Sequence, residues 1–325
     1  MEMSSPWAYE PGTLAWHPSR DIIVTAWGIV SQDPFACLER WQAIPPGDSD
    51  SRPMFAGATW SRDGRHLIAG WNVRRREAPF PTYLIEIEVE SGDFTLLSGD
   101  EFGFRNLMPE VSHSSGDVAF LSYATPAEQF PRLALLPPVG EASVLFENIR
   151  YLHPLWDPSG SLLLVAALDR DEGHQLLVSR EGAVVERISS MPGHPVGWID
   201  ADHILCSSDD TLYRVRWKDG NTDVVGQPGR LIGRCKVSPA RTTVACFVSE
   251  TAVGEESIYR LLLHDLGTGQ PRTVLAKQGE EARFLGAPCW SPDGTKIAYL
   301  TEGGKSPAEL WVVSADGTGV NMVWP

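Results

Sequence analysis

Short apolar runs separated by polar turns recur along the chain at spacings of 39 to 53 residues. The runs at 162–166 and 297–300 are apolar at consecutive positions, which is typical of strands covered on both faces. After each run, a polar loop leads to a third strand, such as 309–313. A turn that contains Gly then leads to a fourth strand, such as 273–276. Four short strands in a repeat of this length predict a propeller blade.

Seven positions anchor these repeats, each at the end of an apolar strand. Turns rich in Ser, Asp, Pro and Gly follow them, and these are the residues that chain reversals favour. The anchors are Trp16, Trp60, Val111, Trp156, Trp198, Val237 and Trp290. We therefore predict an all-β fold: a seven-bladed β-propeller of mainly four-stranded antiparallel blades. It would be a single domain over residues 1–325.

A solenoid of helix pairs is the competing architecture, but the repeats lack amphipathic helical stretches. Residues 33–41 are an exception, with Asp33 as a helix cap and Pro34 at the first helical position. The blade plan requires a strand there, and we follow the plan because packing overrides local propensity. Residues 319–324 or a segment around Trp7 could form the outer strand of the last blade, and we favour 319–324.

One repeat carries a family resemblance. Residues 290–294 read Trp-Ser-Pro-Asp-Gly, and 309–317 read Glu-Leu-Trp-Val-Val-Ser-Ala-Asp-Gly. This pattern resembles the TolB-like (WD40-like) propeller repeat, and similar repeats occur in the propeller domains of prolyl oligopeptidase-type enzymes. The Gly-His and Trp-Asp pairs of the WD-repeat family are missing at that family's spacing.

The resemblance covers essentially the whole chain and implies a propeller, with six blades in many members of the family. It also implies a periplasmic role beside a membrane-associated lipoprotein. Propeller lyases with a similar topology place a divalent metal among channel histidines, which here would fall on His153 and His194. Two histidines without a third ligand make a weak site, so we predict no metal.

Composition narrows the function classes. The chain is 42% hydrophobic and 21% charged, with a net charge of −15. Such a chain repels nucleic acid, and no apolar run is long enough for membrane insertion. The first residues lack the pattern of a signal peptide, which favours the cytoplasm, or the periplasm if the N-terminus was trimmed.

Cysteine usage supports the same compartment. The chain has five cysteines and no Cys-x-x-Cys pair, so we expect free thiols in a reducing cytoplasm. Cys235 and Cys246 fall in adjacent strands and are the pair most able to form a disulfide.

Signatures of enzymes are mostly absent. The sequence has no Gly-x-Ser-x-Gly elbow, no His-Glu-x-x-His zinc motif and no complete phosphate-binding loop. No cofactor is implied. The anchor tryptophans are interpreted as wedges between blades, and Asp63 and Asp293 as turn formers.

Arginine is the most informative charged residue, with 22 Arg against five Lys. Four arginines lie six or seven residues before an anchor, where the innermost strand of a blade begins, and His153 and His194 lie between them. We predict that they line one mouth of the central channel, with the loop Arg74, Arg75 and Arg76 on the same face. The four are Arg105, Arg150, Arg230 and Arg283.

Two interpretations of these arginines stay open. They can capture carboxylate or phosphate groups, for which Arg is well suited. They can equally pair with Asp or Glu of neighbouring blades, and this structural role carries the larger weight.

The predicted function is a non-catalytic protein- or peptide-interaction module, a cytoplasmic scaffold that binds a partner on the face with the Arg-lined mouth. The alternative is a small-molecule enzyme or sensor of lyase or hydrolase type. It would act on an anionic, possibly carbohydrate, ligand in the central channel. Fold alone does not decide between them.

Overall fold

The protein is seen in a computed structural model that describes residues 14–25, 28–31, 54–72, 81–98, 102–149, 153–169, 172–188, 191–232, 234–250, 257–279, 284–301 and 309–324. Every regular element in these ranges is a strand, and none of the described segments is a helix able to cross a membrane.

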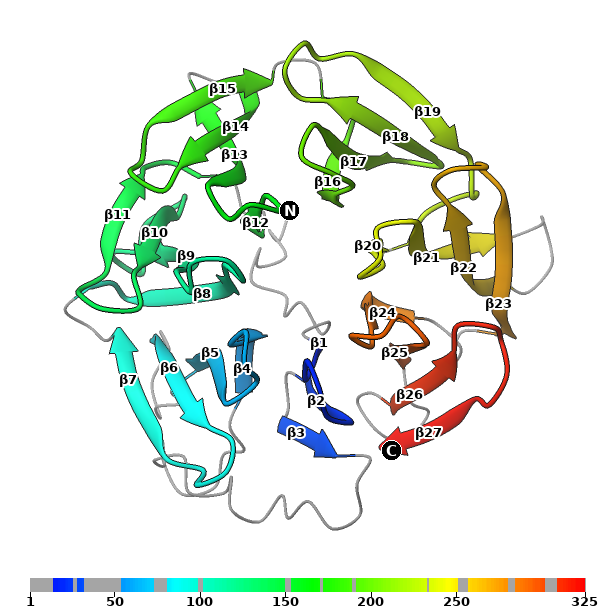
Figure 1. Ribbon diagram of the computed structural model, residues 1–325, viewed down its shortest axis with the longest axis horizontal. Helices are drawn as coiled ribbons and strands as arrows, with labels where there is room; N and C mark the ends of the chain where they lie inside the picture. The colour runs from blue at the N-terminus through cyan, green and yellow to red at the C-terminus, as the bar shows by residue number, and fades with distance from the viewer. Residues whose placement is uncertain are drawn as a thin grey trace, which may run out of the picture.

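The strands form sheets around a common centre, and strands such as β1, β4, β12 and β20 lie innermost (Figure 1). The first sheet has three strands: β1 (Leu14–Trp16), β2 (Ile22–Thr25) and β3 (Gly28–Ser31). An eight-stranded sheet follows: β4 (Met54–Trp60), β5 (His66–Asn72), β6 (Thr82–Glu88), β7 (Phe94–Ser98), β8 (Arg105–Val111), β9 (Val118–Tyr123), β10 (Arg132–Leu136) and β11 (Ser143–Phe146).

Four further sheets are blades of four antiparallel strands each. Two of them are β12 (Leu155–Trp156), β13 (Leu162–Asp169), β14 (Glu172–Ser179), β15 (Val184–Ile188), and β16 (His194–Trp198), β17 (His203–Ser208), β18 (Thr211–Arg216), β19 (Thr222–Gly226). The other two are β20 (Lys236–Val237), β21 (Thr243–Glu250), β22 (Ile258–Asp265), β23 (Pro271–Gln278), and β24 (Phe284–Trp290), β25 (Lys296–Thr301), β26 (Glu309–Ser314), β27 (Asn321–Trp324).

The prediction of seven blades is wrong, although the all-β class is confirmed. Only four of the described sheets are four-stranded blades. The first sheet has three described strands. The strands β4–β7 and β8–β11 are joined into one sheet by a parallel contact between Thr82 of β6 and Arg105 of β8. This contact links residues that no repeat pattern pairs.

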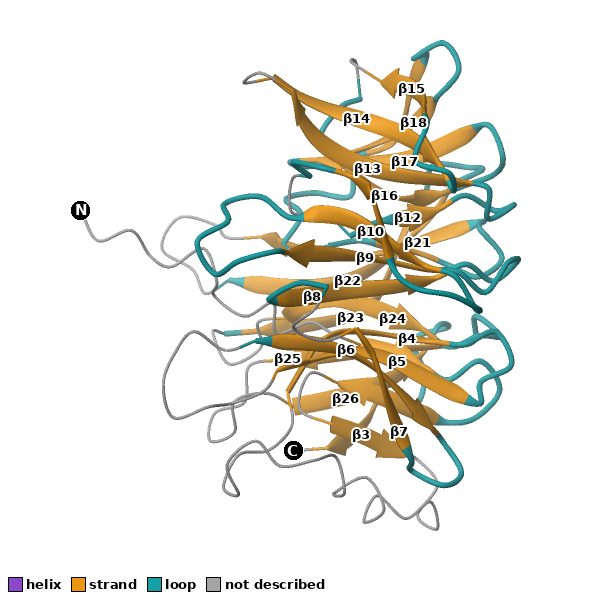
Figure 2. Cartoon of the chain, turned by 90° about the vertical axis from the view of Figure 1, so that its left-hand side faces the viewer, coloured by secondary structure: helices purple, strands orange, loops and turns teal. Residues whose placement is uncertain are grey.

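The turns after the anchors form as their sequences predict. Asp63 accepts hydrogen bonds from the Ser61 hydroxyl (2.8 Å) and the Arg65 backbone N–H (3.0 Å). Asp293 plays the same part with Ser291 at 2.6 Å. The prediction that these two aspartates form turns is therefore confirmed. Figure 2 views the ring edge-on, with the strands running across its thickness and most of the described loops along one side.

The first sheet meets the eight-stranded sheet through a histidine and a glycine. The His17 imidazole packs edge-on against Trp60, with ring centroids 4.7 Å apart, and its Nε2 lies 2.8 Å from the Gly64 carbonyl oxygen. Gly64 has φ +71°, and a Cβ there would lie 2.6 Å from His17 Cε1. Any larger residue would push the two sheets apart. Burial lowers the pKa of His17, which favours the neutral ring.

The two ends of the described chain meet by side-chain packing. Trp16 and Ile23 of the first sheet pack with Ala298 and Leu300 of the last blade, and Lys296 Nζ lies 3.3 Å from Asp21 Oδ2. Strand β27 pairs with β26, so the expected outer strand within 319–324 is confirmed. No described strand is shared between the two sheets. The segment 33–41 lies outside the described residues.

Four cysteines are free and buried: Cys206, Cys235, Cys246 and Cys289. The prediction of free thiols is confirmed for these four, and Cys37 lies outside the described residues. Burial raises the pKa of the Cys206 thiol to about 12, which makes it a poor nucleophile.

We expect these four thiols to react with a thiol reagent only after denaturation, without any reductant. The reason is that burial both excludes the reagent and disfavours the thiolate. Counting reacted thiols by intact mass in native buffer and in denaturant is the measurement. Cys235 and Cys246 stand opposite one another if the register of β20 and β21 continues by one residue. A mass deficit at this pair in fully denatured protein would contradict the expectation.

Candidate functional site

The anchor tryptophans fasten each sheet to the one before it. Four of them donate the indole N–H to the carbonyl of the residue that directly precedes the previous anchor. The bonds are Trp60 to Ala15 (3.2 Å), Trp156 to Glu110 (3.0 Å), Trp198 to Leu155 (3.3 Å) and Trp290 to Lys236 (2.9 Å). This confirms the prediction that they are wedges, and it fixes the residues before the anchors at equivalent places on the innermost strands.

The two valine anchors have no indole, and other bonds join the sheets there. Where the repeat of Val111 meets the repeat before it, the Thr82 backbone N–H donates to the Phe104 carbonyl at 3.1 Å. Where the blade of Val237 meets the blade before it, the Arg214 guanidinium donates to the Leu266 carbonyl at 3.0 Å.

Several arginines tie neighbouring sheets together, which is the structural role that the sequence analysis considered for arginine. They are arginines that the sequence had not singled out. Arg20 pairs with Glu90 at 3.2 Å, and Arg180 pairs with the fully buried Asp117. Arg272 donates to the Ala315 carbonyl at 2.6 Å. These arginines lie in turns or on an outer strand, where nothing in the sequence distinguishes a paired arginine from a solvated one.

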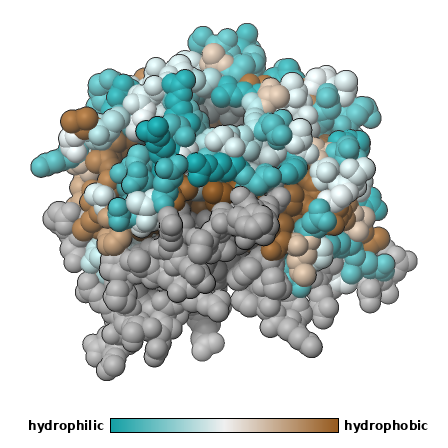
Figure 3. Space-filling model, turned by 60° about the horizontal axis from the view of Figure 1, so that its bottom comes forward, coloured by the Kyte–Doolittle hydropathy of each residue, from teal (hydrophilic) through white to brown (hydrophobic). Residues whose placement is uncertain are grey.

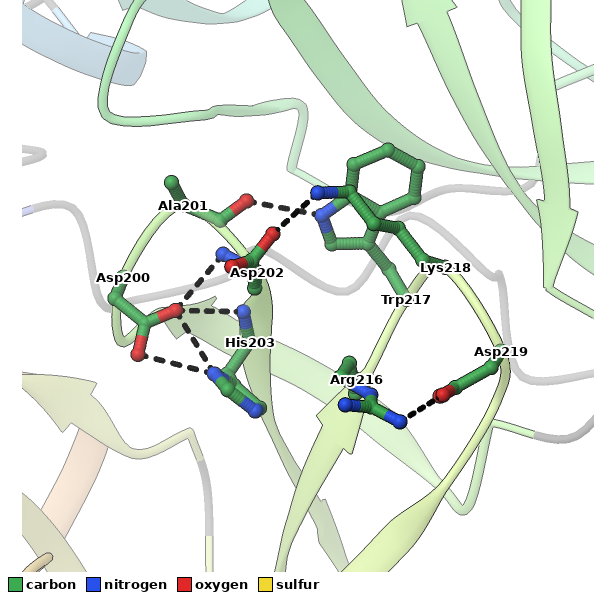
Figure 4. A network of polar contacts seen from close by, with 8 residues as sticks. All are labelled: Asp200, Ala201, Asp202, His203, Arg216, Trp217, Lys218 and Asp219. Atoms are coloured by element: carbon green, nitrogen blue, oxygen red, sulfur yellow. Dashed lines mark hydrogen bonds and ion pairs between the residues drawn. The ribbon is translucent and has the colours of Figure 1, made fainter.

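The turns of blade β16–β19 hold a dense polar network, drawn in Figure 4. Lys218 Nζ lies 2.6 Å from Asp202, Arg216 pairs with Asp219, and the Trp217 indole donates to the Ala201 carbonyl at 3.0 Å. His203 Nδ1 lies 2.9 Å from Asp200. Each charged group here has a partner within its own blade, so the network stabilises the turns.

Three of the predicted site residues fall on or beside innermost strands. Arg105 begins β8, with its guanidinium 5.8 Å from the centroid of the Phe104 ring. His194 begins β16 and is exposed. Arg230 is exposed, and its carbonyl accepts the Ser249 backbone N–H at 2.9 Å, which places it alongside β21.

The other predicted arginines lie outside the described residues: Arg74, Arg75, Arg76, Arg150 and Arg283. The convergence of four arginines at one mouth therefore stays a prediction.

His153 meets a carboxylate that the sequence had not singled out. Its Nδ1 is 3.7 Å from Glu110 Oε2 and 3.3 Å from the Pro154 carbonyl oxygen. Both side chains keep 28% exposure. Burial among the innermost strands lowers the pKa of His153 to about 3, with Lys236 and Arg234 adding to the shift. Burial also raises the pKa of Glu110, against the attraction of Lys236.

Lys236 and Arg234 supply positive charge from the facing side of the ring. They belong to the innermost segment of blade β20–β23, while Glu110 and His153 belong to β8 and the approach to β12 (Figure 1). The Arg234 backbone N–H donates to the Gly286 carbonyl at 3.3 Å, which ties this segment to β24.

Position relative to the anchors is the signal that could have found these residues. Glu110 and Lys236 each stand one residue before an anchor, and His153 and Arg234 each stand three before. An aligned set of repeats read at these two positions would have brought all four together.

The described residues contain no group of three or more His, Cys, Asp or Glu side chains placed to hold a metal ion. Among the contacts of the described residues, none joins His194 to His153. On the face that Figure 3 shows, hydrophilic side chains predominate among the described residues, with hydrophobic ones between them. Large exposed hydrophobic side chains lie on outermost strands, such as Leu96 of β7, Val224 of β19 and Met322 of β27.

Comparison with solved structures places the chain among propellers. It is similar to TolB from Acinetobacter baumannii (18% identity, TM-score 0.55, covering 75% of this chain and 60% of that one). It is also similar to the β-propeller domain of the trilobed protease from Pyrococcus furiosus (13%, 0.61, 84% and 83%). A third likeness is to an oligogalacturonate lyase in complex with manganese (13%, 0.58, 82% and 76%).

These likenesses establish a TolB-like propeller fold and nothing finer. The chain spans 60% of the length of the TolB structure, and 46% of an acylaminoacyl peptidase from Pyrococcus horikoshii that it also resembles (12% identity, TM-score 0.61). No family model and no curated protein matches the sequence. The WD40 form of the repeat finds no support in the comparisons.

Proposed function

We propose that the protein is a non-catalytic interaction module that binds an acidic peptide segment of a partner protein at the centre of the propeller. The observation that carries this proposal is the innermost segment of blade β20–β23, which presents Arg230, Arg234 and Lys236. The chain as a whole has a net charge of −15. A local run of positive charge in such a chain attracts and orients an anionic partner.

The contacts of four other arginines support the proposed role of this basic segment. Arg20, Arg180, Arg214 and Arg272 are engaged with neighbouring sheets. The exposed guanidinium of Arg230, by contrast, has no partner among the described residues. An arginine in that state can form charge-assisted, bidentate hydrogen bonds with a carboxylate. The free buried thiols fit a reducing compartment, and we propose the cytoplasm.

Binding of a fluorescent Glu-rich peptide to the intact protein tests the proposal by anisotropy. We expect saturable binding that weakens as salt rises, because exposed charges are screened over about 8–10 Å at ordinary ionic strength. Arg230→Ala should weaken binding by about 10- to 100-fold, since a hydrogen bond to a charged group contributes about 1.5–3 kcal/mol.

The matched control is Arg65→Ala, which removes the same charge from a side chain that is 78% exposed in a turn. It should leave peptide binding unchanged. Equal losses in both variants would reduce the effect to net charge, and absence of saturable binding would refute the proposed function.

A small-molecule enzyme or sensor is the second candidate, and the pair Glu110 and His153 is what favours it. An acid with a raised pKa beside a neutral histidine is an arrangement that acid–base catalysis uses. The likeness to an oligogalacturonate lyase suggests an anionic carbohydrate as the ligand. Turnover of oligogalacturonate, abolished by His153→Ala, would favour this candidate. Unchanged substrate after long incubation with manganese would oppose it.

A further inference from the structure

Opposite charges face one another across the centre of the ring. Strand β8, which carries Glu110, lies on one side, and strand β20, which carries Lys236, lies on the other (Figure 1). Glu110 is in contact with His153. The carbonyls of Glu110 and Lys236 accept equivalent indole N–H bonds, from Trp156 and Trp290. Their backbones therefore stand at the same level of the ring, on rigid innermost strands.

Glu110 and Lys236 do not pair directly. No ion pair or hydrogen bond joins them among the described residues, although the charge of Lys236 acts on both Glu110 and His153. Lys236 is exposed, and Glu110 keeps 28% exposure. Neither the ammonium nor the carboxylate is bonded to the other, and solvent reaches both.

We propose that Glu110 and Lys236 together bind a small zwitterion of the α-amino acid class. The ligand ammonium donates to the Glu110 carboxylate, and the ligand carboxylate accepts from the Lys236 ammonium. Each charge of the ligand then meets its opposite through a charge-assisted hydrogen bond. Arg234, on the same segment as Lys236, adds positive charge on the carboxylate side.

Ligands with a single charge fit this arrangement less well. An anion placed against Lys236 also approaches Glu110, and a cation placed against Glu110 also approaches Lys236. His153 does not oppose the ligand ammonium, because its low pKa leaves the ring uncharged at neutral pH. A metal ion would face the Lys236 ammonium without three protein ligands among the described residues. The inference goes beyond the proposed function, which depends on Arg230.

The experiment is calorimetric titration of the intact protein with three probes of similar size: L-alanine, propionate and ethylamine. Alanine carries both charges, and each of the others carries one. We expect saturable binding of alanine, with propionate and ethylamine at least tenfold weaker. Glu110→Gln and Lys236→Met each remove one charge while keeping the side-chain length, and each should weaken alanine binding at least tenfold. Arg65→Met is the control and should bind alanine normally.

The possible results separate the two proposals. Glu110→Gln removes a negative charge near the basic segment, so it should leave binding of the acidic peptide intact or strengthen it while alanine binding is lost. Propionate binding as tight as that of alanine, or the absence of saturable alanine binding to the unaltered protein, would overturn the zwitterion site. Should either variant unfold, the three probes on the unaltered protein still decide.

Discussion

Replacement of Trp60 by alanine is expected to lower the free energy of unfolding by about 3–5 kcal/mol, the usual effect of removing a buried aromatic side chain. Trp60 is 4% exposed and packs in a cluster with Phe55, Leu67 and Ile85. Its loss also removes the edge-on contact with His17 and the bond to the Ala15 carbonyl. The measurement is urea unfolding followed by far-UV circular dichroism.

Trp60→Phe separates the two contributions, because it keeps an aromatic ring and removes the indole N–H. Losing that bond alone should cost about 1 kcal/mol. Trp217→Phe is the matched control, since Trp217 also donates its N–H to a carbonyl but within its own blade. If Trp60→Ala were as stable as Trp217→Phe, Trp60 would not act as a wedge between the sheets.

The second large effect is expected for Arg180→Ala, which should destabilise the protein by about 1–3 kcal/mol. Arg180 is 42% exposed, and by ordinary rules its removal would change stability little. Its partner Asp117, however, is fully buried, and the Asp117 Oδ1 atom has no hydrogen-bond partner among the described residues. Removing the guanidinium leaves a buried carboxylate without its counter-charge.

A double-mutant cycle identifies the cause. Asp117→Asn in the Arg180→Ala background removes the stranded charge, so the double variant should be more stable than the sum of the single effects, by about 0.5–3 kcal/mol. Arg65→Ala, which loses an exposed contact at 3.9 Å, should change stability by no more than about 0.5 kcal/mol. Strict additivity at Asp117 and Arg180 would argue against the buried pair.

Local and periodic signals explain what the sequence could predict. Runs such as Ile297–Leu300 are apolar because both faces are covered, and the Asp293 turn forms from residues within five positions of one another. The all-β class and the strand at the C-terminal end follow from these short-range patterns. The number of blades does not, because the contact between Thr82 and Arg105 joins two repeats through backbone groups that carry no residue-type signal.

The site shows a similar division. Clusters of arginine are conspicuous in a chain with few lysines, so sequence reasoning favoured them. Glu110 and Lys236 are far apart in the sequence and lie on β8 and β20, and only the ring brings these two strands to facing positions. The preference for a structural role of arginine holds for Arg180 and Arg272, while Arg230 keeps the binding role as a proposal.

The bonds from the anchor indoles also have a spectroscopic consequence. Trp60, Trp156, Trp198 and Trp290 each report on a different junction between sheets, through one proton bonded to a backbone carbonyl. Indole N–H resonances are resolved from the amide region of a proton–nitrogen spectrum. Their rates of hydrogen exchange would rank the junctions by how often each one opens. The four junctions that a tryptophan holds thus carry built-in probes for where the breathing motions of the ring begin.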